Sequence, residues 1–171
     1  MNQRVEKALN EQIEKEAKSS HFYLAMASWA ENQGLSGTAK FLYAHSDEER
    51  FHMLKLVKFV NERGGLAIIP GLNQPSASFK SLEHVFQLLL EHELMVTESI
   101  NDLVDTCLQE KDYTTHNFVQ WYVSEQLEEE ALARNILDKI KLIGADKAGL
   151  YMLDRDFENS TIQADSTANQ A

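Results

Sequence analysis

Two polar residues, Glu49 and His52, lie where the apolar face of an amphipathic helix should continue. Steps of three and four residues predict this helix, and its apolar face runs through Ala39, Leu42, His45, Glu49, His52, Leu56 and Phe59. Burial of an unpaired carboxylate is so costly that such a group is normally protonated, paired or bound to a metal. The rest of the chain must therefore supply partners for Glu49 and His52 inside the core.

Four long amphipathic segments and one short segment account for most of the chain, so the sequence predicts an all-α fold. Only two prolines and seven glycines occur in 171 residues, which favours long helices over a sheet. Gly34 and Gly64 are placed to end the first two helices, and Ser36 is a plausible N-cap for the second. The expected helices span about 4–33, about 37–63, from Ser78 or Ser81 to a short connector at 112–114, from there to Gly144, and about 146–156.

The link at residues 64–79 is longer than the other connections and shows no helical period. About sixteen extended residues reach roughly 50 Å, whereas a helix of about 28 residues is roughly 42 Å long. The link can therefore run the full length of a bundle and start the third helix parallel to the second. A loose up-down-up-down connection would have the same sequence, so both topologies of a four-helix bundle stay open at this point.

Each of the four long segments has a polar interruption near its middle, and the interruptions are Glu16, Glu49 with His52, Glu93, and Gln126 with Glu129. Glu16 and Glu49 are 33 residues apart, as are Glu93 and Gln126. In an antiparallel helix pair, residues equidistant from the turn lie side by side. Glu16 and His52 are equidistant from Gly34, and Glu93 and Glu129 are equidistant from Lys111, and both midpoints fall in short turns. All four polar clusters are therefore expected to meet in the core at the level of the helix midpoints.

Four carboxylates, one imidazole and one amide would make an oxygen-rich site for two cations. Carboxylate and imidazole ligands together suit iron or manganese, zinc is possible, and copper(I) would require soft sulfur ligands. Four negative charges balance two divalent ions, which removes the cost of burying Glu49. Di-iron carboxylate bundles are a known example of this arrangement, in which facing helices supply Glu and Glu-x-x-His ligands.

The chain resembles the bacterial non-haem ferritin family from about residue 4 to residue 156. The motifs that carry the resemblance are NEQIEKEAKSS at 10–20, ERFH at 49–52, NFVQWYVSEQLEEE at 117–130 and GLYMLD at 149–154. The resemblance implies a ferritin-like four-helix bundle with a long crossover between the second and third helices and a short fifth helix. It also implies a shell of 24 subunits.

The resemblance further implies a ferroxidase centre with two iron sites and a third site beside them. It assigns the first iron to Glu16, Glu49 and His52. It assigns the second iron to Glu49, Glu93 and Glu129, with Gln126 close by. It maps the third iron onto Glu48, Glu125, Glu128 and Glu129, although the acidic run at 128–130 has a second interpretation as a solvated helix face.

Tyr23 lies two turns beyond Glu16 on the same helix face. It is either a core aromatic with a hydrogen-bonded hydroxyl or, as the resemblance implies, a catalytic residue that donates an electron to the centre. Trp121 and Tyr122 are secondary candidates for the same role. The remaining histidines lack carboxylates at a matching level and are interpreted as structural or exposed: His21, His45, His84, His92 and His116.

Two departures from related di-iron patterns refine the interpretation. The fourth helix offers Gln126-x-x-Glu129 without a second histidine, so the second iron should bind less firmly, as suits iron in transit. Arg50 occupies the position at which bacterioferritins carry a haem-binding methionine, so no haem is expected by that route.

These features predict an iron-storage protein with ferroxidase activity, which uses O2 or H2O2 to oxidise Fe(II) and keeps the product as a mineral. One alternative is a di-iron oxidase or peroxidase that stores no iron. The other is a metal-free helical binding module whose core acids form hydrogen-bond networks.

Composition limits the partners and the location. The net charge of −11 argues against non-specific nucleic-acid binding and against an anionic membrane surface. The single cysteine, Cys107, suits a reducing compartment, and neither a secretory signal nor a membrane-spanning run is visible. We therefore expect a cytoplasmic protein with one domain at 1–156 and a polar, flexible tail at 157–171.

Overall fold

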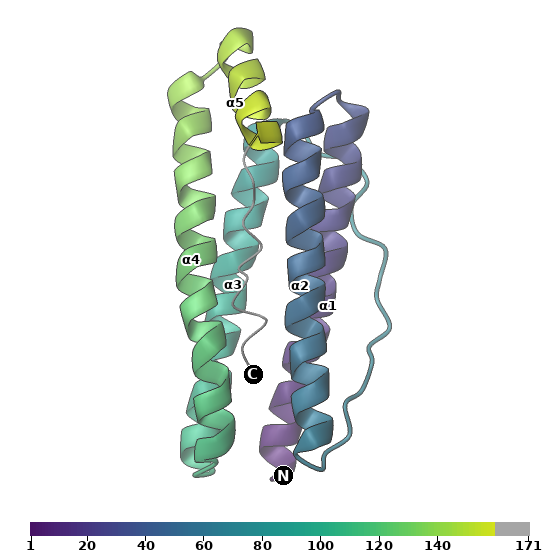
Figure 1. Cartoon of the computed structure of the whole chain (residues 1–171), viewed down its shortest axis with the longest axis vertical. Helices are drawn as coiled ribbons and strands as arrows, with labels where there is room; N and C mark the ends of the chain where they lie inside the picture. Colours follow the sequence, from purple (N-terminus) through teal and green to yellow (C-terminus); the bar gives the residue numbers. More distant parts are fainter. Residues whose placement is uncertain (160–171) are drawn as a thin grey trace.

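The computed structural model, which describes residues 1–159, is a bundle of four long helices with a fifth, short helix at one end (Figure 1). The helices are α1 (Gln3–Asn32), α2 (Ser36–Glu62), α3 (Leu82–Gln109), α4 (Tyr113–Ile143) and α5 (Lys147–Asn159). No strand occurs in these residues, and none of their helices is both long and apolar enough to cross a membrane. The predicted all-α class and helix order are confirmed.

The segment between α2 and α3 is a true crossover that runs along the length of the bundle (Figure 1). Near its start, the backbone N–H of Ile68 donates to Asn10 in the first half of α1, at 2.7 Å. Near its end, the ring of Phe79 packs against Trp29 in the last turns of α1, with 5.7 Å between centroids. Helices α2 and α3 are therefore parallel, and the up-down-up-down alternative is wrong.

Local capping explains most helix ends, with one exception. Gly34 and Gly64 follow α1 and α2 with φ values of +78° and +75°, the left-handed conformation that glycine adopts without steric cost. The Ser81 side chain accepts from the N–H of His84 at 3.1 Å, so Ser81 rather than Ser78 caps α3. The predicted N-cap at Ser36 is wrong, because Ser36 is already helical and the preceding Leu35 makes no side-chain cap.

A carboxylate from α5 caps the start of α2 instead. Asp154 accepts hydrogen bonds from the backbone N–H groups of Gly37 and Thr38, at 3.2 and 2.8 Å. It also accepts from the Thr38 hydroxyl at 2.7 Å. This negative charge satisfies N–H groups that have no partner within α2, and it therefore anchors α5 to the bundle.

Helix α5 extends further than the sequence pattern indicated. Its expected end was near Asp156, but it continues to Asn159. The Phe157 ring packs on Phe41 and Phe86, with centroid distances of 4.9 and 5.8 Å. Phe157 therefore belongs to the packed structure rather than to a polar tail, and residues 160–171 of that expected tail lie outside the described part.

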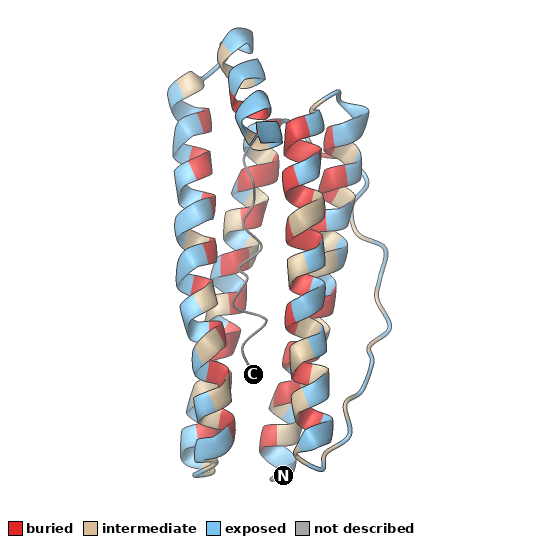
Figure 2. Cartoon of the chain, viewed as in Figure 1, coloured by how far each residue is buried: buried red, intermediate tan, exposed pale blue. Residues whose placement is uncertain are grey.

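The apolar core consists of two clusters, and a layer of buried polar residues lies between them. One cluster, which includes Met26 and Phe86, extends toward α5, and the other includes Leu9 and Ile100. Buried positions follow the inward faces of all the long helices (Figure 2). Apolar packing at both ends thus fixes the helices around the polar layer at mid-bundle.

Candidate metal centre

The six residues that interrupt the apolar stripes come together in the polar layer, from four different helices. Glu16 comes from α1, Glu49 and His52 from α2, Glu93 from α3, and Gln126 and Glu129 from α4. All six are buried, with exposed fractions between 1% and 7%. The spacing argument therefore placed these side chains correctly, although spacing alone does not establish what they bind.

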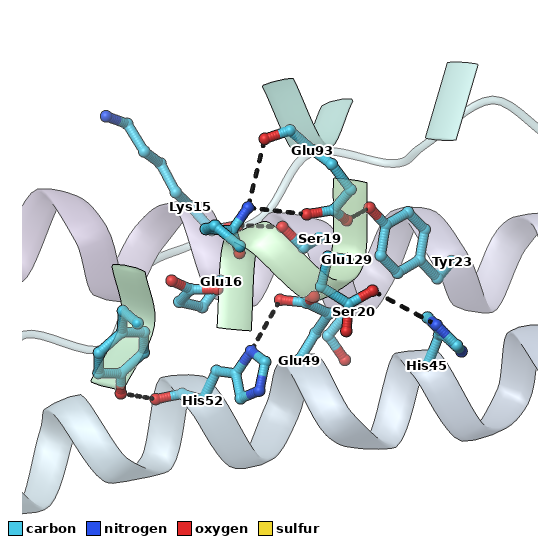
Figure 3. Close-up of polar contacts among 12 residues, drawn as sticks. Lys15, Glu16, Ser19, Ser20, Tyr23, His45, Glu49, His52, Glu93 and Glu129 are labelled. Carbon is cyan, nitrogen blue, oxygen red and sulfur yellow. Dashed lines mark hydrogen bonds and ion pairs between the residues drawn. The ribbon is translucent and has the colours of Figure 1, made fainter. Parts of the chain in front are cut away.

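Glu16, Glu49 and His52 form the tightest group. One ligand atom from each lies within 4.8 Å of the others. The distance from His52 Nδ1 to Glu49 Oε2 is 3.6 Å (Figure 3). Among the described residues, this buried Glu49 oxygen has no hydrogen-bond partner. An unpartnered buried carboxylate oxygen beside an imidazole and a second carboxylate fits a cation well.

Hydrogen bonds from α1 and α3 orient Glu16. The Gln12 amide, one turn earlier on α1, donates to Glu16 Oε1 at 2.7 Å. The Ser99 hydroxyl of α3 donates to the Gln12 carbonyl at 2.6 Å. This chain of polar contacts holds Glu16 on the inward face, where it can act as a ligand.

Glu93 is held by donors from two neighbouring helices. The Tyr23 hydroxyl donates to Glu93 Oε1, and the Gln126 amide donates to Glu93 Oε2 at 3.0 Å. Tyr23 is fully buried, so its hydroxyl has the bonded environment that the first interpretation of this residue required. The same contact places the phenol directly against an expected iron ligand, so it is equally consistent with the electron-donor interpretation.

The expected second set, Glu49, Glu93 and Glu129, shares the polar layer but is not a compact group like the first. Three groups in the described chain have ligand atoms within 4.8 Å of one another: Glu16, Glu49 and His52; His45, Glu48 and Glu129; and Glu48, His52 and Glu125. Glu129 is directed toward His45, and Glu93 is directed toward Tyr23 (Figure 3). Glu93 also accepts a hydrogen bond from Gln126.

His45 is the residue that the sequence interpretation missed. Its Nε2 lies 3.5 Å from Glu129 Oε2, so the expectation that it lacks a carboxylate partner is wrong. The pairing of His45 with Glu129 follows from the register of α2 against α4. Tyr122 donates to the His52 carbonyl at 2.8 Å, and a two-turn step along each antiparallel helix leads to His45 and Glu129.

The other residues expected at the third site differ in environment. Glu48 and Glu125 are partly buried, whereas Glu128 is exposed. All three line a cavity of about 680 Å³ between α2, α4 and α5, together with His45 and Glu129. The predicted four-acid set therefore faces one cavity, but the compact groups also contain imidazoles.

His92 has the structural role expected of it, since it contacts Ser19 at 2.7 Å and burial lowers its pKa to about 4.

Burial and mutual repulsion favour the protonated form of the acids. Burial, followed by the charge of neighbouring Glu49, raises the pKa of Glu16 well above its ordinary value. The pKa of Glu49 is also raised, by burial first and the Glu93 charge second. Burial and the Glu129 charge raise the pKa of Glu93 from 4.5 to about 7. The metal-free centre therefore stores protons that a cation must displace.

Cation binding at this centre is expected to strengthen as the pH rises from about 6 to about 8. Below pH 7 a cation must displace the Glu93 proton, because the pKa of this acid is raised to about 7. Since the folded state holds that proton and the unfolded chain does not, the contribution of Glu93 to the stability of the metal-free fold falls between pH 4.5 and about 7 and is constant above that range. Calorimetric Zn²⁺ titration in buffers of different ionisation enthalpy should show more protons released at pH 6 than at pH 8. Equal release would contradict this account.

Comparison with known proteins gives consistent matches. A family model described as a ferritin-like domain matches residues 6–143. The chain is 48% identical over 159 residues to a bacterial non-heme ferritin of Campylobacter jejuni, covering 93% of this chain and 95% of that protein. It is 45% identical over 164 residues to a probable bacterial non-heme ferritin-like protein of Haemophilus influenzae, covering 96% and 99%.

A solved structure supports the same assignment. The fold matches an open pore ferritin from the hyperthermophilic archaeon Archaeoglobus fulgidus with a TM-score of 0.92 and 40% identity. The match covers 94% of this chain and 98% of that chain. The resemblance found in the sequence is confirmed, and the chain belongs to the ferritin family.

Proposed function

We propose that this protein stores iron and is a ferroxidase, which oxidises Fe(II) to Fe(III) with O2 or H2O2. Membership of the ferritin family supports both parts of this function. The observation that carries the proposal is the buried group of Glu16, Glu49 and His52, in which Glu49 Oε2 has no hydrogen-bond partner in the described chain. A metal-free binding module would leave that oxygen uncompensated, whereas a bound cation satisfies it.

The proposed site binds two ferrous ions as substrate. Glu16 and His52 hold the first ion, Glu93 and Glu129 hold the second with Gln126 beside it, and Glu49 lies between them as a bridging ligand. Two ferrous ions release two electrons, the number needed with two protons to convert O2 to H2O2 or H2O2 to two waters. The Gln126 amide donates to Glu93. Because the amide is neutral, it adds no negative charge to hold the second ion.

Further parts of the proposal concern the surroundings of the pair. Tyr23, bonded to Glu93, is placed to supply an additional electron. Glu48, Glu125, Glu128 and Glu129 line the neighbouring cavity and are proposed to attract a third iron. The assembly is proposed to be a hollow shell of 24 subunits, and the single cysteine suits a cytoplasmic location.

One experiment separates storage from its alternatives. Excess Fe(II) is added in air to the full-length protein, and the product is sized and analysed for iron. A particle of 24 copies of a 19.5-kDa chain, about 470 kDa, should retain far more iron than its binding sites hold. Oxidation without retention would favour a non-storing oxidase, and absence of oxidation would favour a binding module.

A further inference from the structure

Three oxidisable side chains lie against the residues proposed to bind iron. The Tyr23 hydroxyl donates to Glu93. The Tyr122 hydroxyl donates to the backbone carbonyl of His52 at 2.8 Å. The Trp121 indole meets the His52 ring edge-on, with 5.2 Å between the centroids and 84° between the planes. Each side chain is therefore close enough to lose an electron to the centre, and proximity alone does not select one of them.

An electron is needed whenever peroxide meets a single ferrous ion. Reduction of H2O2 to two waters takes two electrons and two protons, and one Fe(II) supplies only one of the electrons. A phenol that supplies the other loses its hydroxyl proton with the electron and becomes a neutral radical. An indole first becomes a radical cation and then loses its N–H proton to water. A positive charge therefore develops on the side chain only in the second case.

The two tyrosines differ in the group that can take the phenol proton. Tyr23 donates to a carboxylate oxygen of Glu93, which accepts a proton readily. Tyr122 donates to a backbone carbonyl, which is a very weak base. Electron loss from Tyr122 would leave the proton without an acceptor on a side chain that is only 2% exposed. The hydrogen bonding therefore favours Tyr23 over Tyr122 as the electron donor.

A cation lies over the face of Trp121. The distance from Lys55 Nζ to the centroid of the Trp121 ring is 3.6 Å, and both residues are partly buried. Such a contact stabilises the neutral indole, whose face is negative, and repels the positive charge of an oxidised indole. Burial lowers the pKa of Lys55 from 10.5, but the Glu125 charge opposes this change and helps to keep the ammonium charged. Lys55 therefore makes Trp121 harder to oxidise.

We propose that Lys55 keeps Trp121 reduced and thereby reserves electron donation for Tyr23. Lys55 is a positioning residue in this scheme, because it acts through the charge that it places over the indole. A tryptophan radical combines with O2 to give permanent products, so the cation also protects a side chain that packs against His52. This role of Lys55 rests on the proposed function, since the centre supplies the Fe(II) and O2 reduction there supplies the peroxide.

The test is repeated addition of Fe(II) in air to the full-length protein, followed by mass spectrometry of its tryptic peptides. The chain has one other tryptophan, Trp29, which packs against Phe79 and serves as an internal reference. In Lys55→Gln, oxygenated Trp121 should increase at least about tenfold over the wild type, while Trp29 is unchanged. Lys55→Arg keeps the cation and should behave as the wild type. Lys58→Gln is the matched control, because Lys58 is an exposed lysine about one turn further along α2, and it too should match the wild type.

Radical spectroscopy identifies the electron donor directly and needs no variant. Wild-type protein frozen shortly after mixing with Fe(II) and H2O2 should show a tyrosyl radical by electron paramagnetic resonance, without a tryptophanyl radical. Lys55→Gln should add the tryptophanyl signal. Protein grown with ring-deuterated tryptophan separates the two species, because deuterium changes the hyperfine pattern of the tryptophanyl radical alone.

The outcomes separate the role of Lys55 from the proposed function. Wild-type levels of Trp121 oxidation in Lys55→Gln, or a tryptophanyl radical as the main species in the wild type, would overturn the role of Lys55 and leave the ferroxidase proposal intact. Equal increases in Lys55→Gln and Lys55→Arg would also overturn it, because altered packing rather than lost charge would then be the cause. A wild type that oxidises no Fe(II) would overturn the proposed function, and the role of Lys55 with it.

Discussion

Replacement of Glu49 by alanine is expected to reduce the initial rate of Fe(II) oxidation at least about 100-fold. Changing a residue that merely supports a metal ligand commonly costs 10–100-fold, and the ligand itself should cost no less. Glu49 is the carboxylate proposed to bridge both irons, and it is 2% exposed beside His52. Stopped-flow absorbance after mixing the full-length shell with Fe(II) in air measures the rate directly.

Two further variants show whether the loss is functional. Glu62→Ala removes an exposed glutamate from the last turn of the same helix and should leave the rate unchanged. Glu49→Gln keeps the side-chain volume but cannot carry charge. Because burial raises the pKa of Glu49, its ionised form is disfavoured, and this variant should leave metal-free stability unchanged or higher while losing activity. Wild-type initial rates in Glu49→Ala would refute the bridging role.

The group of Glu16, Glu49 and His52 could be predicted from the sequence because its geometry is local. Glu49 and His52 lie one turn apart on one helix, and a tight turn fixes Glu16 at the same level on the antiparallel neighbour. The pairing of His45 with Glu129 is different. It depends on how the α1–α2 hairpin packs against the α3–α4 hairpin, and no short turn joins those two units. The sequence therefore predicted each hairpin better than the register between them.

The same division applies to the fold. Gly34 and Gly64 end helices through their own backbone conformations, so the pattern predicted both positions. The start of α2 depends on Asp154, more than 100 residues away, and no local pattern at Ser36 could reveal it. The inclusion of Phe157 in α5 likewise results from packing against Phe41 and Phe86. Tertiary contacts, rather than helix propensity, determined the features that the sequence did not predict.

Replacement of Gly37 by alanine is expected to weaken the docking of α5 on the bundle. A Cβ at Gly37 would lie 1.8 Å from the Asp154 carbonyl oxygen and 2.9 Å from the Glu158 backbone nitrogen, and neither backbone atom can move without shifting α5. Such a shift also removes the Asp154 cap from the N–H groups of α2. Overpacking costs about 1–3 kcal/mol and loss of a cap about 1 kcal/mol, so α5 docking should weaken by about 3 kcal/mol.

Limited trypsin digestion measures this loss, because Lys147 and Arg155 are exposed residues within α5. A loss of about 3 kcal/mol raises the population of the detached state about 100-fold, and cleavage within α5 should accelerate to a similar extent when opening is fast. Gly71→Ala in the crossover is the matched control, since a Cβ there meets no atom within 4 Å. It should be cleaved at the wild-type rate. Equal digestion of the Gly37 and Gly71 variants would show that the close approach of the α5 backbone to Gly37 does not hold α5 in place. Faster cleavage of Gly37→Ala alone would identify Gly37 and Asp154 as the attachment point.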